Sequence, residues 1–276
     1  MSDIVHTPPS VPPASEETSD ASLMPEIRSI GLDAPFRWLA AGLKDMQATR
    51  LRASFYGLIF MLMGFAIMAI YETRWQLTMG LTAGFFLVGP FLFCGIYWLS
   101  RQREHGEKPG LTASLFCWKE NPASIGFFAA ILTFLMVVWA RVSVVIFALF
   151  STRDFPTMQG MIFQIFSMTN IPFVIAWFGV GFIFASIAFA ISVVSVPLML
   201  DRNTDTMIAL FTSVRALWQN TLPLYLWAAL IVALVGASLL LFFIPLLLTA
   251  PLVGHATWHA YRDLVAQPDG EGARCK

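Results

Sequence analysis

The composition of this 276-residue chain predicts a membrane protein, because 57% of its residues are hydrophobic and only 12% are charged. Soluble domains average roughly 25% charged residues, and one of this length could not bury so much apolar surface away from water. The 17 Lys and Arg balance the 17 Asp and Glu, which removes any electrostatic reason to expect a nucleic-acid partner. The cysteines, Cys94, Cys117 and Cys275, are spaced too widely for a disulfide framework or a CxxC metal site.

Both ends of the chain are polar. Residues 1–32 are rich in Pro, Ser, Glu and Thr and lack the apolar stretch of a secretory signal, so we expect a disordered tail. Residues 266–276 form a second, short polar tail. The sequence between them, 33–265, is predicted to be one membrane domain.

Apolar runs long enough to cross a bilayer recur along this domain. The last run, 222–261, would be about 60 Å long as one helix, which is twice the hydrocarbon thickness. It contains Gly236, Ser238 and Pro245, so we divide it into a hairpin. The predicted fold is an all-α, polytopic membrane helix bundle with six transmembrane helices, at about 53–71, 75–99, 122–150, 170–200, 222–238 and 241–261.

The distribution of basic residues supports six spans. Six spans put 14 of the 17 Lys and Arg on the side of the termini, and the opposite side holds only Arg74 and Arg153. By the positive-inside rule both termini are then cytoplasmic. A five-span chain would export the basic C-terminal tail.

Short amphipathic segments precede the predicted hairpins. The clearest is 207–218, and its apolar residues recur at helical spacing: Met207, Leu210, Phe211, Val214, Leu217 and Trp218. A second lies ahead of the first span, with Phe36, Leu39, Ala40, Leu43 and Met46 on one side and Arg37, Lys44 and Asp45 on the other. A weaker one covers 111–119. We expect such helices to lie in the cytoplasmic headgroup layer.

The second span of each hairpin has a proline near its cytoplasmic end: Pro90, Pro197 and Pro251. This pattern indicates three degenerate repeats of an amphipathic surface helix plus a helical hairpin. The alternative is that membrane helices contain many prolines in general.

Arg141 is a functional candidate, because ionisable side chains inside a span are costly. It follows Trp139 and lies near the outer end of the third span. One interpretation is that the guanidinium snorkels beside an aromatic belt. The other is a contact with an anion or a carboxylate inside the bundle.

His255 and His259 are the only metal-like pair in the chain. They are four residues apart, so they share one helical face. Alignment on the prolines pairs Asp201 with His255 and Asp205 with His259, which gives a hypothetical site of two His and two carboxylates for a divalent metal. The alternatives are ordinary: Asp205 is well placed as a helix N-cap, and His near Trp258 is common at membrane interfaces.

Four stretches resemble a family of bacterial predicted integral membrane proteins of unknown function: GFFLVGPFLFCGIYWLSR, VVWARVSVVIFALF, FAISVVSVPLMLDRNTD and GHATWHAYRDL. Some relatives are labelled as similar to cytochrome c oxidase subunit I. An oxidase core of that kind needs about a dozen spans and six His ligands, whereas this chain has four His. The resemblance therefore implies a bacterial inner-membrane location and no established activity.

The predicted function is that of a non-enzymatic inner-membrane scaffold or a small-solute or ion permease, with the lipid bilayer as its partner and no cofactor. No HExxH, GxxxxGK[ST], GxGxxG or GxSxG motif is present to suggest catalysis. A homo-oligomer or another membrane subunit is a further possible partner. The alternatives are a metal- or haem-associated redox protein that uses His255 and His259, and a lipid-modifying enzyme.

Overall fold

The computed structural model describes residues 24–150 and 171–267, with the side chains of 71–81, 83 and 86 left undescribed. Both predicted tails lie mostly outside these residues. Within them the chain forms helices and no strand, which confirms the all-α class. The helices are α1 (Ala34–Glu104), α2 (Leu111–Phe116), η3 (Cys117–Glu120), α3 (Pro122–Phe150), α5 (Ile171–Ser192), α6 (Ser195–Arg202), α7 (Thr206–Gln219), α8 (Thr221–Leu240) and α9 (Leu246–Leu264).

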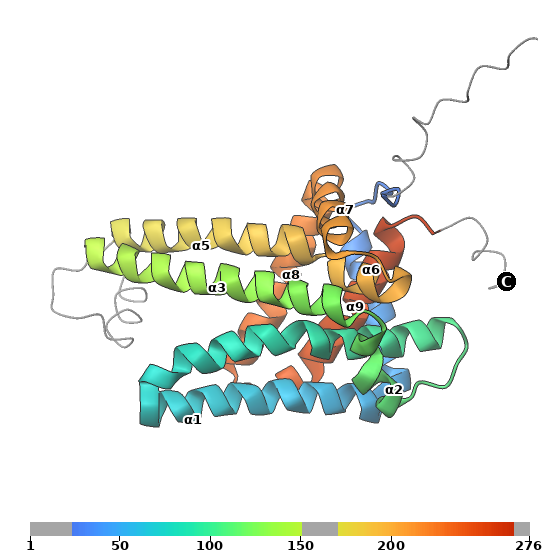
Figure 1. Ribbon diagram of the computed structural model, residues 1–276, viewed down its shortest axis with the longest axis horizontal. Coiled ribbons are helices and arrows are strands. Elements are labelled where there is room, and N and C mark those ends of the chain that lie inside the picture. The colour runs from blue at the N-terminus through green and yellow to red at the C-terminus, as the bar shows by residue number, and fades with distance from the viewer. Residues whose placement is uncertain (1–23, 151–170, 268–276) are drawn as a thin grey trace, which may run out of the picture.

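Helix α1 doubles back on itself (Figure 1). A straight helix of its 71 residues would extend about 105 Å. Instead, the rings of Phe60 and Phe93 lie 5.2 Å apart, and Asp45 contacts Arg103. The outward half, up to Ile70, and the return half, which ends at Glu104, therefore form an antiparallel hairpin.

The outward half of α1 packs closely on α9 because small residues line the contact. A Cβ on Gly42 would lie 2.7 Å from the backbone nitrogen of Ala256, and a Cβ on Gly57 would clash with the Leu247 carbonyl. On the return half, Ile96 fills the space above Gly254, where a Cβ would meet it at 2.7 Å. Glycine is required at these positions so that the backbones can approach, as in other membrane helix pairs.

Helices α3 and α5 run side by side (Figure 1). The helical conformation is interrupted between α5 and α6. The break falls one turn before Pro197. Proline has no N–H to bond the carbonyl four residues earlier, so the helix is interrupted there. The hydroxyl of Ser195 donates to the carbonyls of Ile191 and Ala209, which links this break to α7.

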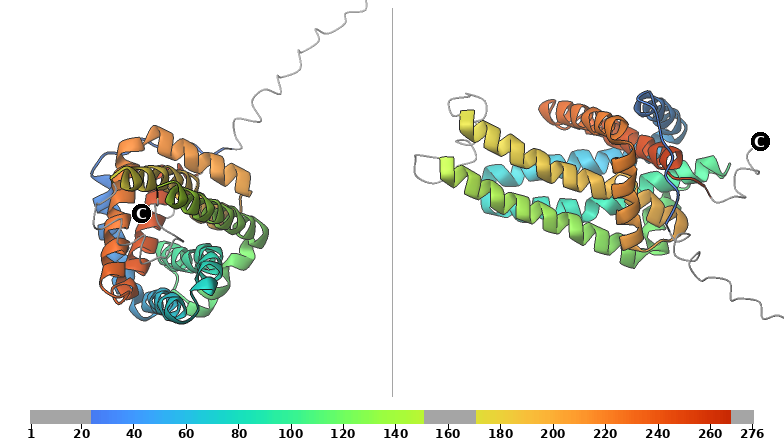
Figure 2. Two further views of the ribbon diagram at one scale, coloured as in Figure 1. Left: turned by 90° about the vertical axis from the view of Figure 1, so that its left-hand side faces the viewer. Right: turned by 90° about the horizontal axis from the view of Figure 1, so that it is seen from above.

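Helix α7 lies across one end of the bundle, whereas α3 and α5 are seen nearly end-on in the same view (left panel of Figure 2). Its small and polar residues, such as Ala209 and Ser213, are buried. Its apolar stripe faces outward, with Phe211 51% and Trp218 85% exposed. Leu210 and Leu217 of the stripe pack partly against the core, whereas Met207, Phe211, Val214 and Trp218 remain exposed.

Four helical stretches of the described residues are long and apolar enough to cross a membrane: Ala34–Ile70, Pro122–Phe150, Ile171–Arg202 and Thr221–Leu240. The return half of α1 and α9 cover the other two predicted spans and are not among them. The predicted hairpin within 222–261 is present, but its turn lies at 241–245, a few residues later than expected.

The two described ends of the chain meet. Ile27 and Val265 form an isolated antiparallel bridge. The amide of Arg28 donates to the Leu264 carbonyl at 2.8 Å, and the amide of Ala266 donates to Glu26 at 2.9 Å. Residues just before α1 and just after α9 therefore lie at the same end of the bundle.

Candidate functional site

A buried polar network joins both halves of α1 to α9, and Asp45 is its centre. Its Oδ1 accepts a hydrogen bond from Arg103 Nη1 at 2.6 Å. Its Oδ2 accepts one from the Ser100 hydroxyl at 2.8 Å and lies 2.9 Å from His259 Nε2. Asp45, Ser100 and His255 are all buried.

His255 is held through two hydroxyl groups. Its Nδ1 lies 2.6 Å from the Ser100 hydroxyl, and its Nε2 lies 3.3 Å from that of Thr49. The Thr49 hydroxyl also donates to the main-chain carbonyl of Asp45 at 2.8 Å. Both imidazole nitrogens of His255 are therefore occupied by protein groups.

The carboxylate of Asp45 links three parts of the fold. It contacts the Arg103 guanidinium at 2.6 Å and accepts a hydrogen bond from the Ser100 hydroxyl, and both residues lie on the return half of α1. It also lies 2.9 Å from Nε2 of His259 on α9. Asp45 therefore connects the outward half of α1 both to the return half and to α9.

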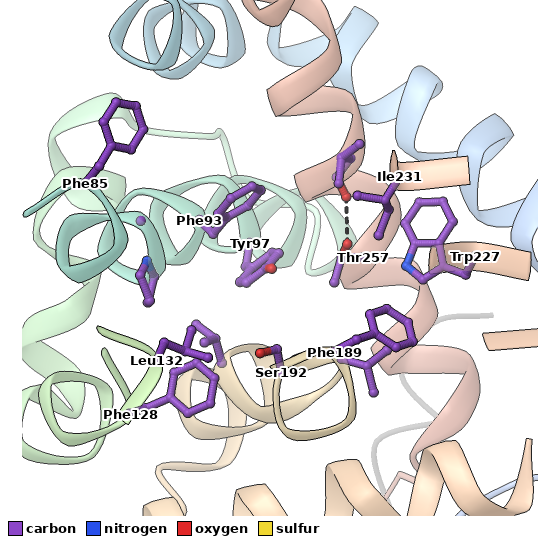
Figure 3. A pocket seen from close by; sticks show the side chains of 15 residues that line it. Phe85, Phe93, Tyr97, Phe128, Leu132, Phe189, Ser192, Trp227, Ile231 and Thr257 are labelled. Carbon is purple, nitrogen blue, oxygen red and sulfur yellow. Dashed lines mark hydrogen bonds between the residues drawn. The ribbon is translucent and has the colours of Figure 1, made fainter. Parts of the chain in front are cut away.

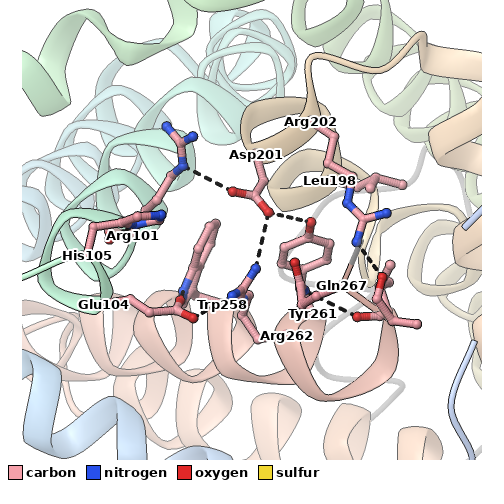
Figure 4. Close-up of polar contacts among 12 residues, drawn as sticks. Arg101, Glu104, His105, Leu198, Asp201, Arg202, Trp258, Tyr261, Arg262 and Gln267 are labelled. Atoms are coloured by element: carbon pink, nitrogen blue, oxygen red, sulfur yellow. Dashed lines mark hydrogen bonds and ion pairs between the residues drawn. The ribbon is translucent and has the colours of Figure 1, made fainter. Parts of the chain in front are cut away.

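A second polar cluster surrounds Asp201 at the end of α6 (Figure 4). The Tyr261 hydroxyl donates to Asp201 Oδ2 at 2.7 Å, and Arg101 Nε donates to Oδ1 at 3.0 Å. Arg262 lies between two carboxylates. Its Nη1 is 3.5 Å from Asp201 Oδ2, and its Nη2 is 2.6 Å from Glu104 Oε1. This cluster fixes α6 and the return half of α1 on α9.

The hypothetical four-residue metal set does not come together. Asp201 is bound by Tyr261 and two arginines. Asp205 caps α7, where its Oδ1 accepts from the amide of Met207 at 2.7 Å. No group of three or more His, Cys, Asp or Glu that could hold a metal ion is found within the described residues. The alignment on prolines fails here because the residues that follow Pro197 and Pro251 continue into different elements.

Arg141 lies on an exposed face of α3. The nearby Trp139 packs on Trp177 and Phe184 of α5, with ring centroids 5.5 Å apart in both pairs. Arg141 makes no ion pair with another described residue. Its exposed position is the one that snorkelling requires.

A cavity of about 350 Å³ lies inside the bundle, between the return half of α1 and helices α3, α5, α6, α8 and α9 (Figure 3). Its wall is mostly apolar and aromatic, including Phe93, Phe128, Phe189 and Trp227. No charged side chain of the described residues lines it. Ligand pockets for small molecules begin at about 300 Å³ and have walls of this kind, so the cavity can hold a small apolar molecule.

The polar network and the cavity use opposite sides of α9. Val253 and Thr257 face the cavity, whereas His255 and His259 face Asp45 and its neighbours. Residues two apart on a helix point in nearly opposite directions. The charged groups are therefore kept away from the cavity.

The sequence pattern missed both features. The sequence pattern places Asp45 on the polar face of a surface helix, and it indicates neither Ser100 nor Thr49 as a candidate. The missed signal was their spacing: Asp45 and Thr49 are four residues apart, as are His255 and His259, so each pair lies on one helical face. The cavity has no sequence signal, because its lining residues are ordinary apolar residues.

Comparison with known proteins recovers a family but no activity. Residues 77–201 match the family model described as "Predicted integral membrane protein (DUF2189)". No curated protein and no solved structure matches the chain. The match begins in α1 and ends in α6, so it includes part of the cavity wall and Asp201. Over these residues the chain matches a family of predicted integral membrane proteins of unknown function, the class that its sequence motifs indicate.

Proposed function

We propose that this chain is a six-span, non-enzymatic inner-membrane protein that holds a small apolar solute in its central cavity. The carrying observation is the cavity of about 350 Å³, which is lined by six helical segments and by no charged side chain of the described residues. The sequence alone predicts a scaffold or a permease for a small solute or an ion. The cavity favours an apolar solute over an ion, because an ion would find no compensating charge there.

Contacts at one end of the bundle support six crossings. The Asp45–Arg103 contact brings the return half of α1 back to the end where α1 starts. The Ile27–Val265 bridge does the same for α9. If the four apolar stretches cross the bilayer, the return half of α1 and α9 must therefore cross as well.

The order of elements also supports the three-part repeat. A short or amphipathic helix precedes an outward helix and a return helix in each part: the start of α1, then α2 with η3, then α7. The concentration of Lys and Arg on the side of the chain ends favours a cytoplasmic location for both termini.

The metal- or haem-associated alternative draws no support from the histidines. The ring nitrogens of His255 face Ser100 and Thr49, and Nε2 of His259 faces Asp45. A metal would have to displace these partners. The same contacts argue against a lipid-modifying enzyme, since the buried Ser100 is closed off by α9 and does not line the cavity.

Filling the cavity tests the proposal. Gly89 lines the cavity, and a Cβ at this position would meet no other atom within 4 Å. Leu in place of Gly89 should therefore occupy the cavity without a backbone clash. Gly236→Leu is the matched control, because a Cβ there also meets nothing and Gly236 does not line the cavity.

The measurement is retention of diphenylmethane by the purified protein, followed by native mass spectrometry. Wild type and Gly236→Leu should each retain the probe, and Gly89→Leu should lose it by at least about tenfold. Equal retention by all three proteins, or no retention by wild type, would contradict the proposal. Thermal unfolding of each variant checks that it is folded.

A further inference from the structure

We infer that the cavity selects an apolar molecule with a neutral carbonyl oxygen, which accepts hydrogen bonds from Tyr97 and Trp227. This inference rests on the proposed function and adds the chemical class of the solute. Its basis is that two hydrogen-bond donors of the cavity wall have no acceptor among the described residues.

Trp227 supplies the first donor. Its side chain is fully buried, and its Nε1 has no hydrogen-bond partner within the described part of the chain. Trp38 packs edge-on against the ring at 5.8 Å. The indole nitrogen lies on the side of the ring that faces the other lining residues (Figure 3). A buried N–H without an acceptor is costly, and a ligand oxygen would remove that cost.

Tyr97 supplies the second donor. It is 6% exposed, and its ring stacks on Phe93 with centroids 6.1 Å apart. No other described residue forms a hydrogen bond with its hydroxyl, which points toward the middle of the lining residues in Figure 3. The cavity therefore presents an O–H and an N–H from two different helices.

The other two hydroxyls of the wall form no hydrogen bond with Tyr97 or Trp227 among the described residues. Ser192 donates to the Ala188 carbonyl of its own helix, and Thr257 donates to the Val253 carbonyl at 2.8 Å. A carbonyl oxygen has two lone pairs and no proton, so one such oxygen can accept from both Tyr97 and Trp227. A carboxylate is disfavoured because no Lys or Arg of the described residues lines the wall.

Two molecules of similar size test this inference. Benzophenone and diphenylmethane differ at the central carbon, which is a ketone in the first and a methylene in the second. Wild type should bind benzophenone about tenfold more tightly, the ratio that two net hydrogen bonds supply. Trp227→Phe should reduce this preference to a few-fold, and Tyr97→Phe combined with Trp227→Phe should abolish it.

Trp98→Phe is the matched control, because the Trp98 Nε1 is also buried without a partner but Trp98 does not line the cavity. This variant should keep the wild-type preference. The carbonyl stretch of ¹³C-labelled benzophenone should lie at lower frequency in wild type than in the double variant. A merely structural role of the two residues would leave that frequency unchanged.

The outcomes separate the two proposals. Equal binding of both probes by wild type, or a preference that Trp227→Phe leaves unchanged, overturns the inference and keeps the apolar cavity. Binding of neither probe overturns the proposed function as well. Mass spectrometry of an organic extract of the untreated protein then distinguishes the sources: an ester lipid indicates a bilayer component, and a free ketone or quinone indicates a separate solute.

Discussion

At the residue scale, Asp45 shows that a sequence pattern can predict the two faces of a helix correctly and still not identify which face packs on the protein. Its neighbours Phe36 and Leu43 do share a face, as predicted, but this apolar face is 56% and 41% exposed at those residues. The face with Asp45 and Thr49 is the one that packs on α9. In a membrane protein an apolar stripe can face lipid, so amphipathicity alone does not identify the side that faces the protein.

Asn in place of Asp45 should destabilise the protein by about 2–4 kcal/mol. The change removes the charge that pairs with Arg103 and His259 in a buried site. The measurement is the unfolding midpoint in detergent micelles. Asp33→Asn is the control, because its pair with Arg37 is exposed and should contribute at most about 1 kcal/mol. Equal midpoints for the two variants would show that Asp45 does not hold α9.

At the element scale, the contact between α1 and α9 depends on residues that lack a side chain. Gly42 and Gly57 lie along the outward half of α1, where α9 approaches the backbone. The glycines are visible in the sequence, but no local pattern predicts which helix packs on them. Only the fold shows that the last helix, and not the adjacent return half, occupies this groove.

Gly57→Ala should destabilise the protein by about 1–3 kcal/mol or more, because the new methyl group would clash with the Leu247 carbonyl, which belongs to rigid backbone. Thermal unfolding measures the effect. Gly126→Ala makes the same change on α3, where a Cβ meets nothing within 4 Å, and it should be neutral or slightly stabilising. A neutral Gly57→Ala would mean that α9 does not approach this closely.

Helix α7 offers a test of the predicted headgroup location. Met207 on its apolar stripe is 49% exposed, and Met24 ahead of α1 is 39% exposed. In lipid nanodiscs, dilute hydrogen peroxide should oxidise Met24 several-fold faster than Met207, because lipid would shield the stripe. Peptide mass spectrometry measures both rates in one sample. Faster oxidation of Met207 would place the stripe in water.

At the scale of the whole molecule, the sequence predicted the helical class and the hairpin of α8 and α9, because long apolar runs and charge clusters are local signals. It could not predict which helices pack together. The apolar walls of the cavity come from residues as distant as Phe85 and Thr257, and no local pattern relates them. The hypothetical metal set failed for the same reason, since it assumed a packing that the repeat alone did not determine.

A reporter fused after residue 276 tests the six crossings. A C-terminal enzyme that is active only in the periplasm should stay inactive, and a fluorescent protein that matures only in the cytoplasm should be bright. A second pair of fusions after Phe150 should give the opposite result, because the proposed six crossings place the end of α3 on the periplasmic side. An active periplasmic reporter at the C-terminus would contradict six crossings with both termini in the cytoplasm.

The contacts of Asp45 also have a consequence for the order in which the protein is made. Its partner His259 is more than 200 residues later in the chain, and it leaves the ribosome long after the first hairpin. Until then the first hairpin resides in the membrane with a carboxylate that only Arg103 and Ser100 can satisfy. Chains truncated before α9 should therefore be targets for membrane quality control.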